Sequence, residues 1–299
     1  MIKVVITGSN GLLGQSLLNL LLKEKDKYKI YGFSKGHNRS GRDDFNYSSL
    51  DITNKDSLTE RIQIIRPDYI INTAAMTQVD VCEENKMACD IINVHVVKWL
   101  SEMCKNINAH LIHISTDFIF DGKKGWYAET DAPNPLSYYG LSKLKSEQVL
   151  KKSTINYTIL RTILVYGKVY DMSRSNIVLW VKESLENKKE ITIVDDQFRT
   201  PTYVKDLALA CKISIDINAT GVFNIASSEL LSIYEMAKQI AEVFNLDDSY
   251  IKPISTSTLN QTANRPIKTG FDLSKTNKEL NFYPKTFKDD LQRFKETLM

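Results

Sequence analysis

The chain opens with a short apolar stretch that runs directly into three glycines. Ile2–Thr7, IKVVIT, has the length and apolar content of a buried strand. The next letters, GSNGLLG, place Gly8, Gly11 and Gly14 three residues apart and lead into an apolar segment of helical length. In such a turn the glycines allow a tight bend, a close backbone approach to a phosphate and close packing of helix on strand. A plain strand–helix turn is the alternative, but this position after a first strand favours a dinucleotide phosphate site at the helix N-terminus.

Apolar strands alternate with helices along the first 165 residues, which predicts an α/β fold. The strands are continuous apolar runs, as expected when both faces of a parallel sheet are covered. We therefore predict a Rossmann-type doubly wound parallel sheet over residues 1–165, to which the chain returns around 203–226. Residues 166–299 are expected to form mainly a smaller C-terminal substrate-binding lobe. Within these domains, Glu84–Asn106 is predicted as one long helix and Ile251–Thr269 as turns and loops.

Composition excludes some classes of function. The chain has 299 residues and a net charge of +3, with 39 basic and 36 acidic residues, so neither nucleic acid nor a membrane is the expected partner. Its four cysteines show no metal-ligand spacing, and they are interpreted as reduced thiols. No metal site is predicted. With no signal-peptide pattern and no apolar run long enough to span a membrane, the expected location is the cytoplasm.

The segment SYYGLSKLKSE, Ser137–Glu147, carries the candidate proton donor. Residues four apart share a helix face, so Tyr139 faces Lys143, whereas Tyr138 faces Ser142. A nearby ammonium favours a phenolate and should lower the pKa of Tyr139, which could then act as general acid toward a carbonyl. A surface helix that happens to carry these residues is the alternative. The glycine loop upstream makes the catalytic interpretation the stronger one.

The end of the second predicted strand bears on the choice of cofactor. An NAD site usually has an acidic residue here for the ribose hydroxyls. This chain has Ser34, Lys35 and Arg39 instead, and such cations suit a 2′-phosphate. NADPH is therefore favoured, with NADH as the alternative.

The glycine spacing, the NTAA segment and the YxxxK pair together resemble the extended branch of the short-chain dehydrogenase/reductases. Within it, STDFIFDG, DDQFRTPT and RPIKT resemble the dTDP-4-dehydrorhamnose reductase family, and the likeness extends along nearly the whole chain. The resemblance implies a catalytic set of Thr116, Tyr139 and Lys143. Tyr139 and Lys143 are also implied as cofactor contacts, together with Gly8, Asn10, Gly11, Leu12, Gly14, Ser34, Lys35, Arg39, Asp51, Ile52, Ala74 and Ala75.

The reaction implied by this resemblance is NADPH-dependent reduction of the C4 ketone of dTDP-4-dehydro-L-rhamnose to dTDP-L-rhamnose, a precursor of cell-surface polysaccharide. Elimination, as in sugar dehydratases, is disfavoured because Thr116 is followed by Asp117 and Phe118 rather than by two acids. A dTDP-linked 4-keto-6-deoxy sugar is the expected partner, and a homodimer is the candidate assembly. Mg²⁺ is used by related reductases, but nothing in the sequence assigns ligands to it. The implied substrate contacts are Val79, Thr116, Asn176, Arg199 and Arg265.

Two departures leave alternatives open. Leu164 stands where the family often has tryptophan, and Lys268 where it has asparagine, so another 4-keto sugar nucleotide is a candidate substrate. The other functions considered are a nucleotide-sugar 4-epimerase and a non-catalytic NADP-binding subunit resembling the regulatory β subunit of methionine adenosyltransferase.

Overall fold

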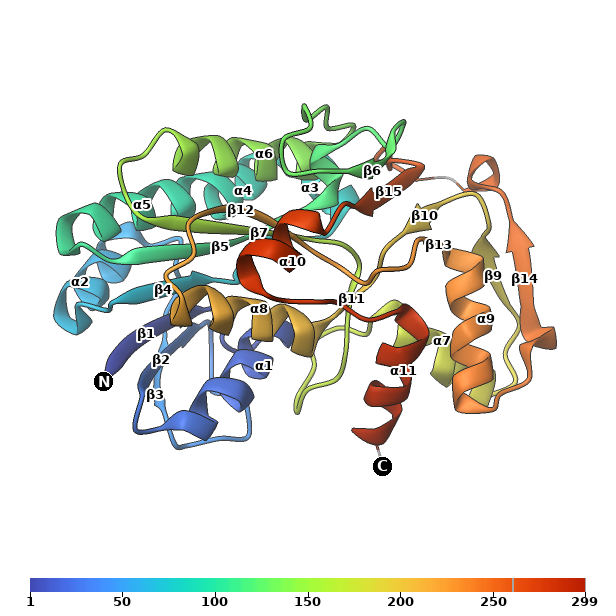
Figure 1. Ribbon diagram of the computed structural model, residues 1–299, viewed down its shortest axis with the longest axis horizontal. Coiled ribbons are helices and arrows are strands. Elements are labelled where there is room, and N and C mark those ends of the chain that lie inside the picture. Colours follow the sequence, from blue (N-terminus) through green and yellow to red (C-terminus); the bar gives the residue numbers. More distant parts are fainter. Residues whose placement is uncertain (260, 299) are drawn as a thin grey trace.

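A seven-stranded parallel sheet forms the larger lobe of the computed structural model, which describes residues 1–259 and 261–298 (Figure 1). Its strand order is β12-β7-β5-β4-β1-β2-β3, and every neighbouring pair is parallel. The predicted doubly wound α/β fold is thereby confirmed. The strands of this sheet are β1 (Ile2–Thr7), β2 (Tyr28–Ser34), β3 (Asn46–Ser49), β4 (Tyr69–Asn72), β5 (His110–Thr116), β7 (Tyr157–Thr162) and β12 (Gly221–Ile225).

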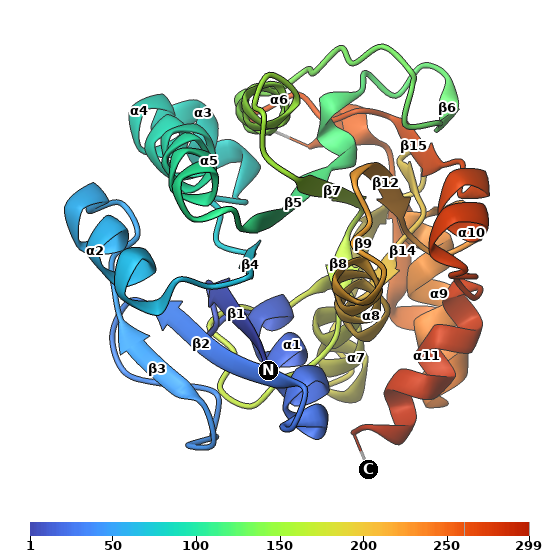
Figure 2. The ribbon, with the colours of Figure 1, turned by 60° about the vertical axis from the view of Figure 1, so that its left-hand side comes forward.

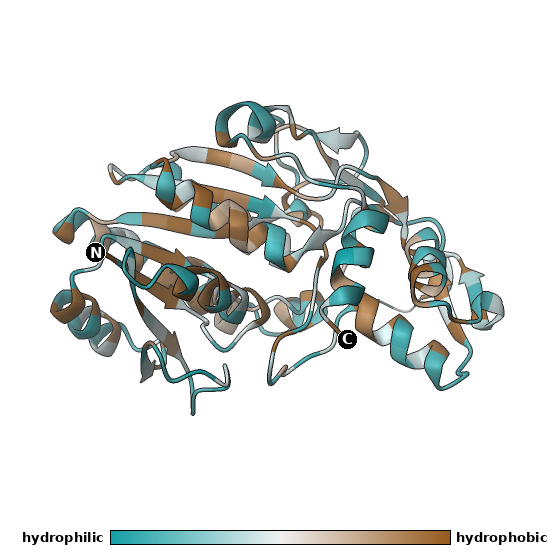
Figure 3. Ribbon diagram, turned by 60° about the horizontal axis from the view of Figure 1, so that its bottom comes forward, coloured by the Kyte–Doolittle hydropathy of each residue, from teal (hydrophilic) through white to brown (hydrophobic). Residues whose placement is uncertain are grey.

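Helices cover both faces of this sheet (Figure 2). Val4 and Ile6 of β1 pack with α1 and α8 on one face, whereas Val5 packs against α2 and α5 on the other, as the alternation of side chains along a strand requires. Both faces are therefore apolar, and the strands are coloured largely as hydrophobic in Figure 3. The covering helices are α1 (Leu12–Leu21), continued by the short η1 (Leu22–Glu24), α2 (Lys55–Ile65), α5 (Val96–Ile107), α6 (Tyr138–Lys151) and α8 (Val204–Asp216).

The helix expected over Glu84–Asn106 is present from Lys86 to Ile107, but it contains a π-helical turn. The chain forms α3 (Val79–Glu84), α4 (Lys86–Asp90), a π-helical turn η2 (Ile91–His95) and then α5. Asn85 begins α4 by accepting a hydrogen bond from the Ala88 N–H, which interrupts the preceding helix. A π turn inside a helix often marks a functional region. This one packs against α6.

The smaller lobe is built from shorter elements, seen at the right of Figure 1. A four-stranded sheet has the order β13-β10-β15-β6, and β14-β9 and β11-β8 are separate pairs. Its core contains Tyr166, Tyr203, Phe287 and Phe294. The strands are β6 (Gly125–Tyr127), β8 (Val165–Tyr166), β9 (Ile191–Val194), β10 (Phe198–Arg199), β11 (Thr202–Tyr203), β13 (Leu231–Ser232), β14 (Ile251–Ile254) and β15 (Lys268–Phe271), and the helical segments are η3 (Asp117–Ile119), α7 (Ile177–Glu186), α9 (Ile233–Phe244), η4 (Asp248–Tyr250), η5 (Thr256–Thr258) and α11 (Phe287–Glu296). The remaining helix, α10 (Ser274–Leu280), packs on α8 and β12 of the larger lobe.

The prediction of turns and loops over Ile251–Thr269 was wrong for its first residues. Ile251–Ile254 forms β14, because it pairs in parallel with Ile191–Val194. The chain also crosses between the lobes more than once: α8 packs on α1, and β12 joins the edge of the large sheet beside β7. Within the described residues, no helix combines the length and apolarity that crossing a bilayer would require.

Candidate active site

The carboxyl ends of β1, β4 and β5 meet at one edge of the large sheet, beside a cavity of about 850 Å³. The strand order reverses at β1, and open α/β sheets bind ligands at this kind of position. Loops from both lobes line the cavity. The predicted site residues that contribute to its wall are Gly8, Asn10, Gly11, Leu12, Ser34, Lys35, Arg39, Ala74, Ala75, Val79, Thr116, Tyr139, Lys143, Asn176 and Arg265.

The glycine loop fits the diphosphate of a dinucleotide. Gly8 has a φ of +71°, and a Cβ there would lie 3.0 Å from the Ala74 N atom. Gly14 lies behind the wall, where a Cβ would be 2.3 Å from the Gly8 carbonyl oxygen, so its part is to let α1 pack against the loop. Gly11 begins α1 without any side-chain cap, and its N-terminal turn borders the cavity. Uncapped N–H groups at such a helix end suit a phosphate.

Asn10 connects the glycine loop to the loop after β2. Its backbone N–H donates to Ser34 Oγ at 3.0 Å, its Nδ2 donates to the His37 carbonyl at 2.9 Å, and its Oδ1 accepts from the Arg39 N–H at 2.9 Å. These bonds hold the segment that was predicted to select the cofactor. The side chain of Arg39 has no ion-pair partner among residues 1–259 and 261–298. It lines the cavity and is available to a phosphate.

Of Lys35, Asp51 and Ile52, only Lys35 lines the cavity. Lys35 Nζ lies 2.8 Å from Asp51 Oδ2, so the lysine at the cavity wall is already paired. Asp51 is outside the wall and also accepts from Thr53. Ile52 is buried in the core beneath α2 and α5. The predicted adenine contacts Asp51 and Ile52 are thus absent from the cavity wall: Asp51 is engaged by Lys35 and Thr53, and Ile52 is part of the core.

Tyr139 and Lys143 both reach the cavity from α6, whereas Tyr138 turns away and donates to Asp90 at 2.7 Å. Tyr139 packs edge-to-face on Phe118, with ring centroids 5.6 Å apart. Burial raises the pKa of Tyr139, against a smaller lowering effect of a hydrogen bond with Thr116. The expected lowering by Lys143 is not found: the main influence is the loss of water around the phenolate, and Lys143 is not among the groups that act on it.

Thr116 lies at the end of β5, next to a buried carboxylate. Its hydroxyl donates to Asp117 Oδ1 at 3.1 Å and accepts from the Phe118 N–H. Thr269 of the smaller lobe donates to the other oxygen of Asp117 at 2.5 Å. Burial raises the pKa of Asp117, while Arg199 acts in the opposite direction. Sequence reasoning did not assign Asp117 a place in the site, although it lines the cavity.

A buried histidine lies beneath Lys143. Lys143 Nζ is 3.1 Å from His113 Nε2, which is also 3.0 Å from Ser146 Oγ. His113 Nδ1 is 3.1 Å from Asn72 Nδ2, so the ring is bonded at both nitrogens. Burial lowers the pKa of Lys143 to about 8 and lowers the pKa of His113 below its usual range. The sequence offered no local signal for His113, because a residue three positions before Thr116 on a strand points to the opposite face.

Asn93, in the π turn η2, is a second residue that sequence reasoning missed. Its Nδ2 is 3.0 Å from both the Met76 carbonyl oxygen and Ser142 Oγ, and its Oδ1 accepts from the Met76 N–H at 2.9 Å. These bonds join the loop after β4 to the face of α6 next to Tyr139. The signal would have been a polar residue at a buried position of a helix.

The predicted substrate residues separate into two groups. Val79, at the start of α3, and Asn176, which caps α7 and donates to the Gly167 carbonyl at 2.7 Å, line the cavity. Arg199 does not. Its guanidinium donates to the carbonyls of Phe198, Ile267 and Pro266 at 2.6 to 3.0 Å. The structure thus assigns Arg199 to fastening the strands of the smaller lobe, because backbone oxygens already occupy its donors.

Arg265 reaches the cavity and forms a two-point ion pair with Asp80. Nη2 lies 2.6 Å from Asp80 Oδ2, and Nη1 lies 3.2 Å from Asp80 Oδ1. The pair links the segment before β15 to α3 of the larger lobe. It holds one cation at the wall of the cavity.

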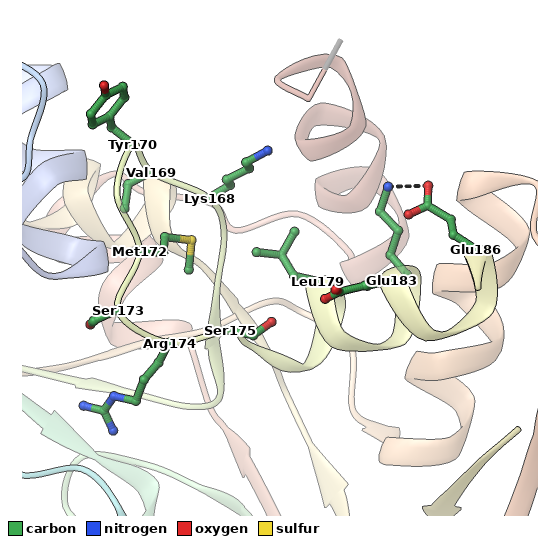
Figure 4. A pocket seen from close by; sticks show the side chains of 11 residues that line it. Lys168, Val169, Tyr170, Met172, Ser173, Arg174, Ser175, Leu179, Glu183 and Glu186 are labelled. Carbon is green, nitrogen blue, oxygen red and sulfur yellow. Dashed lines mark hydrogen bonds and ion pairs between the residues drawn. The ribbon is translucent and has the colours of Figure 1, made fainter. Parts of the chain in front are cut away.

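The loop of residues 168–175, before α7, forms the opposite wall. It also borders a second cavity of about 440 Å³ over α7 (Figure 4). Lys182 and Glu186 of α7 pair with each other at 2.5 Å, while Arg174 points away from them. Leu164, at the wall of the large cavity, has a φ of +42°, a strained conformation for a branched residue. Such outliers gather at functional sites.

The comparisons agree with this geometry. A family model described as "RmlD substrate binding domain" matches residues 2–299. The chain is 30% identical over 307 residues to dTDP-4-dehydrorhamnose reductase of Aggregatibacter actinomycetemcomitans, covering 99% of each chain. It is 31% identical over 278 residues to methionine adenosyltransferase 2 subunit beta of Danio rerio, covering 91% of this chain and 83% of the relative. The crystal structure of dTDP-4-dehydrorhamnose reductase from Bacillus anthracis str. Ames in complex with NADP superposes with a TM-score of 0.87 at 30% identity, covering 99% of this chain and 100% of that chain.

Proposed function

The chain belongs to the RmlD substrate-binding domain family, and from this premise we propose that it is an NADPH-dependent reductase of a nucleotide-linked 4-keto sugar. The favoured substrate is dTDP-4-dehydro-L-rhamnose, as the reductase relatives suggest. The observation that carries the proposal is the convergence of Thr116, Tyr139 and Lys143 on the cavity that the glycine loop borders. A cofactor-binding loop and a proton donor in one cavity are what carbonyl reduction needs.

The bound dinucleotide would supply the hydride for C4 of the sugar. Tyr139 then donates its phenolic proton to the carbonyl oxygen, and its raised pKa means that it holds this proton at neutral pH. Thr116 is placed to hydrogen-bond the same oxygen as negative charge develops. Lys143, charged below about pH 8, lines the same cavity, and its positive charge would favour the phenolate that Tyr139 becomes.

Binding would be divided between the lobes. The N-terminal turn of α1 and Arg39 suit the diphosphate and the 2′-phosphate of NADPH. Val79, Asn176 and Arg265 suit the sugar nucleotide, with Arg265 toward its diphosphate. The proposal keeps the finer expectations from the sequence: a dTDP-linked 4-keto-6-deoxy sugar as substrate, a product used for cell-surface polysaccharide, work in the cytoplasm and a homodimer.

A reductase assay tests this proposal. The protein is mixed with NADPH and dTDP-4-dehydro-L-rhamnose, and oxidation of NADPH is followed at 340 nm. We expect Tyr139→Phe to lower kcat by about 10² to 10⁴-fold, the usual contribution of general acid catalysis. Tyr138→Phe is the matched control, because its hydroxyl bonds to Asp90 outside the cavity, and it should keep most of the activity. Full activity in Tyr139→Phe would refute the mechanism.

The likeness to methionine adenosyltransferase subunit beta supports a second candidate, a non-catalytic regulatory subunit. Such a subunit has no need of a proton donor in the cofactor cavity. If no 4-keto sugar nucleotide oxidises NADPH above background, and the protein instead binds and alters the activity of a methionine adenosyltransferase, this candidate replaces the reductase.

A further inference from the structure

Asp80 is a charged residue at the edge of the candidate site for which the proposed reaction has no role. It lies in the first turn of α3 and accepts the two-point ion pair from Arg265. Its Oδ1 also accepts from the Ala263 N–H at 2.9 Å, two residues before the arginine. Asp80 therefore holds both the side chain of Arg265 and the backbone that carries it, across 185 residues of sequence.

The donors of the guanidinium can be counted. Arginine has five N–H donors in a planar fork. Two bond to Asp80, and a third donates from Nη1 to the Ala263 carbonyl at 3.0 Å. The remaining two are the Nε–H and the second Nη2–H, which share one edge of the fork. No acceptor for that edge is found among residues 1–259 and 261–298.

An Nε/Nη2 edge of this kind is suited to two oxygens of a phosphate or carboxylate group. Arg265 lines the cavity, so the edge belongs to a group that borders the ligand space. Neighbouring Arg199 differs: it is buried and does not line the cavity, three backbone carbonyls take three of its four Nη–H donors, and Asp117 lies 3.8 Å from its Nε. The two arginines thus differ in what they can still bind.

We propose that Asp80 is a positioning residue, which holds Arg265 so that its Nε/Nη2 edge is presented to the diphosphate of a nucleotide-linked substrate. This inference rests on the proposed function and deepens it. Asp80 positions Arg265 and does not compete with the ligand for it. The two oxygens of Asp80 and the Ala263 carbonyl fix the plane of the guanidinium and leave its Nε/Nη2 edge free. Arg265 lowers the pKa of Asp80, so the carboxylate stays ionised at neutral pH.

The pair is also a convenient target for mutation. Its side chains are 18% and 41% exposed, and exposed ion pairs contribute little to folding. Loss of Asp80 should therefore change ligand binding without unfolding the protein. Asp80→Asn keeps the shape of the side chain but cannot accept from both Nη atoms, so the guanidinium loses its fixed orientation.

The test measures two quantities: the binding of dTDP, which serves as a probe for the nucleotide diphosphate, and the kinetics with the sugar nucleotide. For Asp80→Asn we expect the Kd for dTDP and the KM for the sugar nucleotide to rise about tenfold, as for loss of one charged hydrogen-bond arrangement. The kcat and the Kd for NADPH should stay as in the wild type. Glu242→Gln is the control, because it breaks an ion pair with Lys288 on α9 and α11 away from the cavity. It should change neither constant.

A double-mutant cycle with Arg265→Ala decides whether Asp80 acts through the arginine. In the Arg265→Ala background, Asp80→Asn should have no further effect on dTDP binding. An equal loss in both backgrounds, tighter dTDP binding by Asp80→Asn, or wild-type dTDP binding by Arg265→Ala would each overturn the inference. If dTDP binding depends on Asp80 but the protein reduces no 4-keto sugar, the proposed reaction is refuted. If the protein reduces the sugar but dTDP binding does not depend on Asp80, only the inference is refuted.

Discussion

At the scale of single residues, loss of water sets the properties of the candidate catalytic groups. Burial raises the pKa of Tyr139 and lowers that of Lys143 to about 8. Their pairing on one helix face was predictable from a spacing of four residues. The direction of the Tyr139 shift was not, because it depends on how deeply the fold buries α6, and a local pattern carries no information on depth.

The lowered pKa of Lys143 predicts that kcat/KM for NADPH falls at alkaline pH. Its pKa is lowered, so the ammonium predominates below about pH 8 and the neutral amine above it. Since kcat/KM for NADPH reports the free enzyme, it should fall as the pH rises through about 8. Lys143→Arg keeps its charge throughout this range and should lose the fall near pH 8, even with lower activity. A wild-type profile that is flat from about pH 7 to 10 would contradict this assignment.

At the scale of elements, a buried ion pair fastens α6 to the large sheet. Glu147 accepts from Arg161 of β7 at 2.9 and 2.8 Å and from Ser115 of β5 at 2.7 Å. The side chains of Glu147 and Arg161 are 0% and 1% exposed. Because Ser115 precedes Thr116, this cluster fixes the strand end of the site relative to the helix that carries Tyr139.

Glu147→Gln should therefore destabilise the fold by about 3 to 5 kcal/mol, because it leaves the Arg161 guanidinium buried without its counter-charge. The free energy of unfolding in urea measures this loss. Glu186→Gln is the comparison, since it breaks an exposed pair with Lys182 on α7 that should be worth about 0.3 to 0.5 kcal/mol. Similar losses of unfolding free energy in the two variants would show that the buried pair of Glu147 and Arg161 stabilises the fold no more than an exposed pair does.

The sequence predicted elements well where one local rule decides them. Buried parallel strands are rich in apolar residues, so β1, β4 and β5 were evident, and the glycines located the first turn. The π-helical turn η2 was missed because its Asn93 bonds to the backbone of Met76 in the loop after β4, and no local pattern specifies that contact. Likewise β14 exists through its pairing with β9, some 60 residues earlier in the chain.

At the scale of the whole molecule, the cavity lies between the lobes and has walls from both. A ligand bound in this cavity should therefore stabilise both lobes together against unfolding. The larger lobe supplies the glycine loop and Arg39. The smaller lobe supplies Asn176 and the segment with Arg265.

NADPH at about 100 times its Kd should raise the free energy of unfolding by about 2.7 kcal/mol, which appears as an increase in Tm. The same concentration of NADH should raise Tm less, because it lacks the 2′-phosphate that Arg39 is free to bind. Arg39→Ala should remove most of this difference while leaving the shift with NADH unchanged. Equal shifts with both cofactors in the wild type would mean that the protein does not select NADPH through this residue.

The sequence by itself determined the sheet of the larger lobe, the glycine turn and the Tyr139–Lys143 pair, because each follows from spacing within a few residues. Only the tertiary structure decided which arginine faces the cavity, which groups lie under Lys143 and where Asp80 belongs. Arg199 and Arg265 are the same residue type in the sequence, and only their hydrogen-bond partners in the fold distinguish them. Those surroundings come from partners up to 185 residues away, and no local pattern specifies contacts over such a separation.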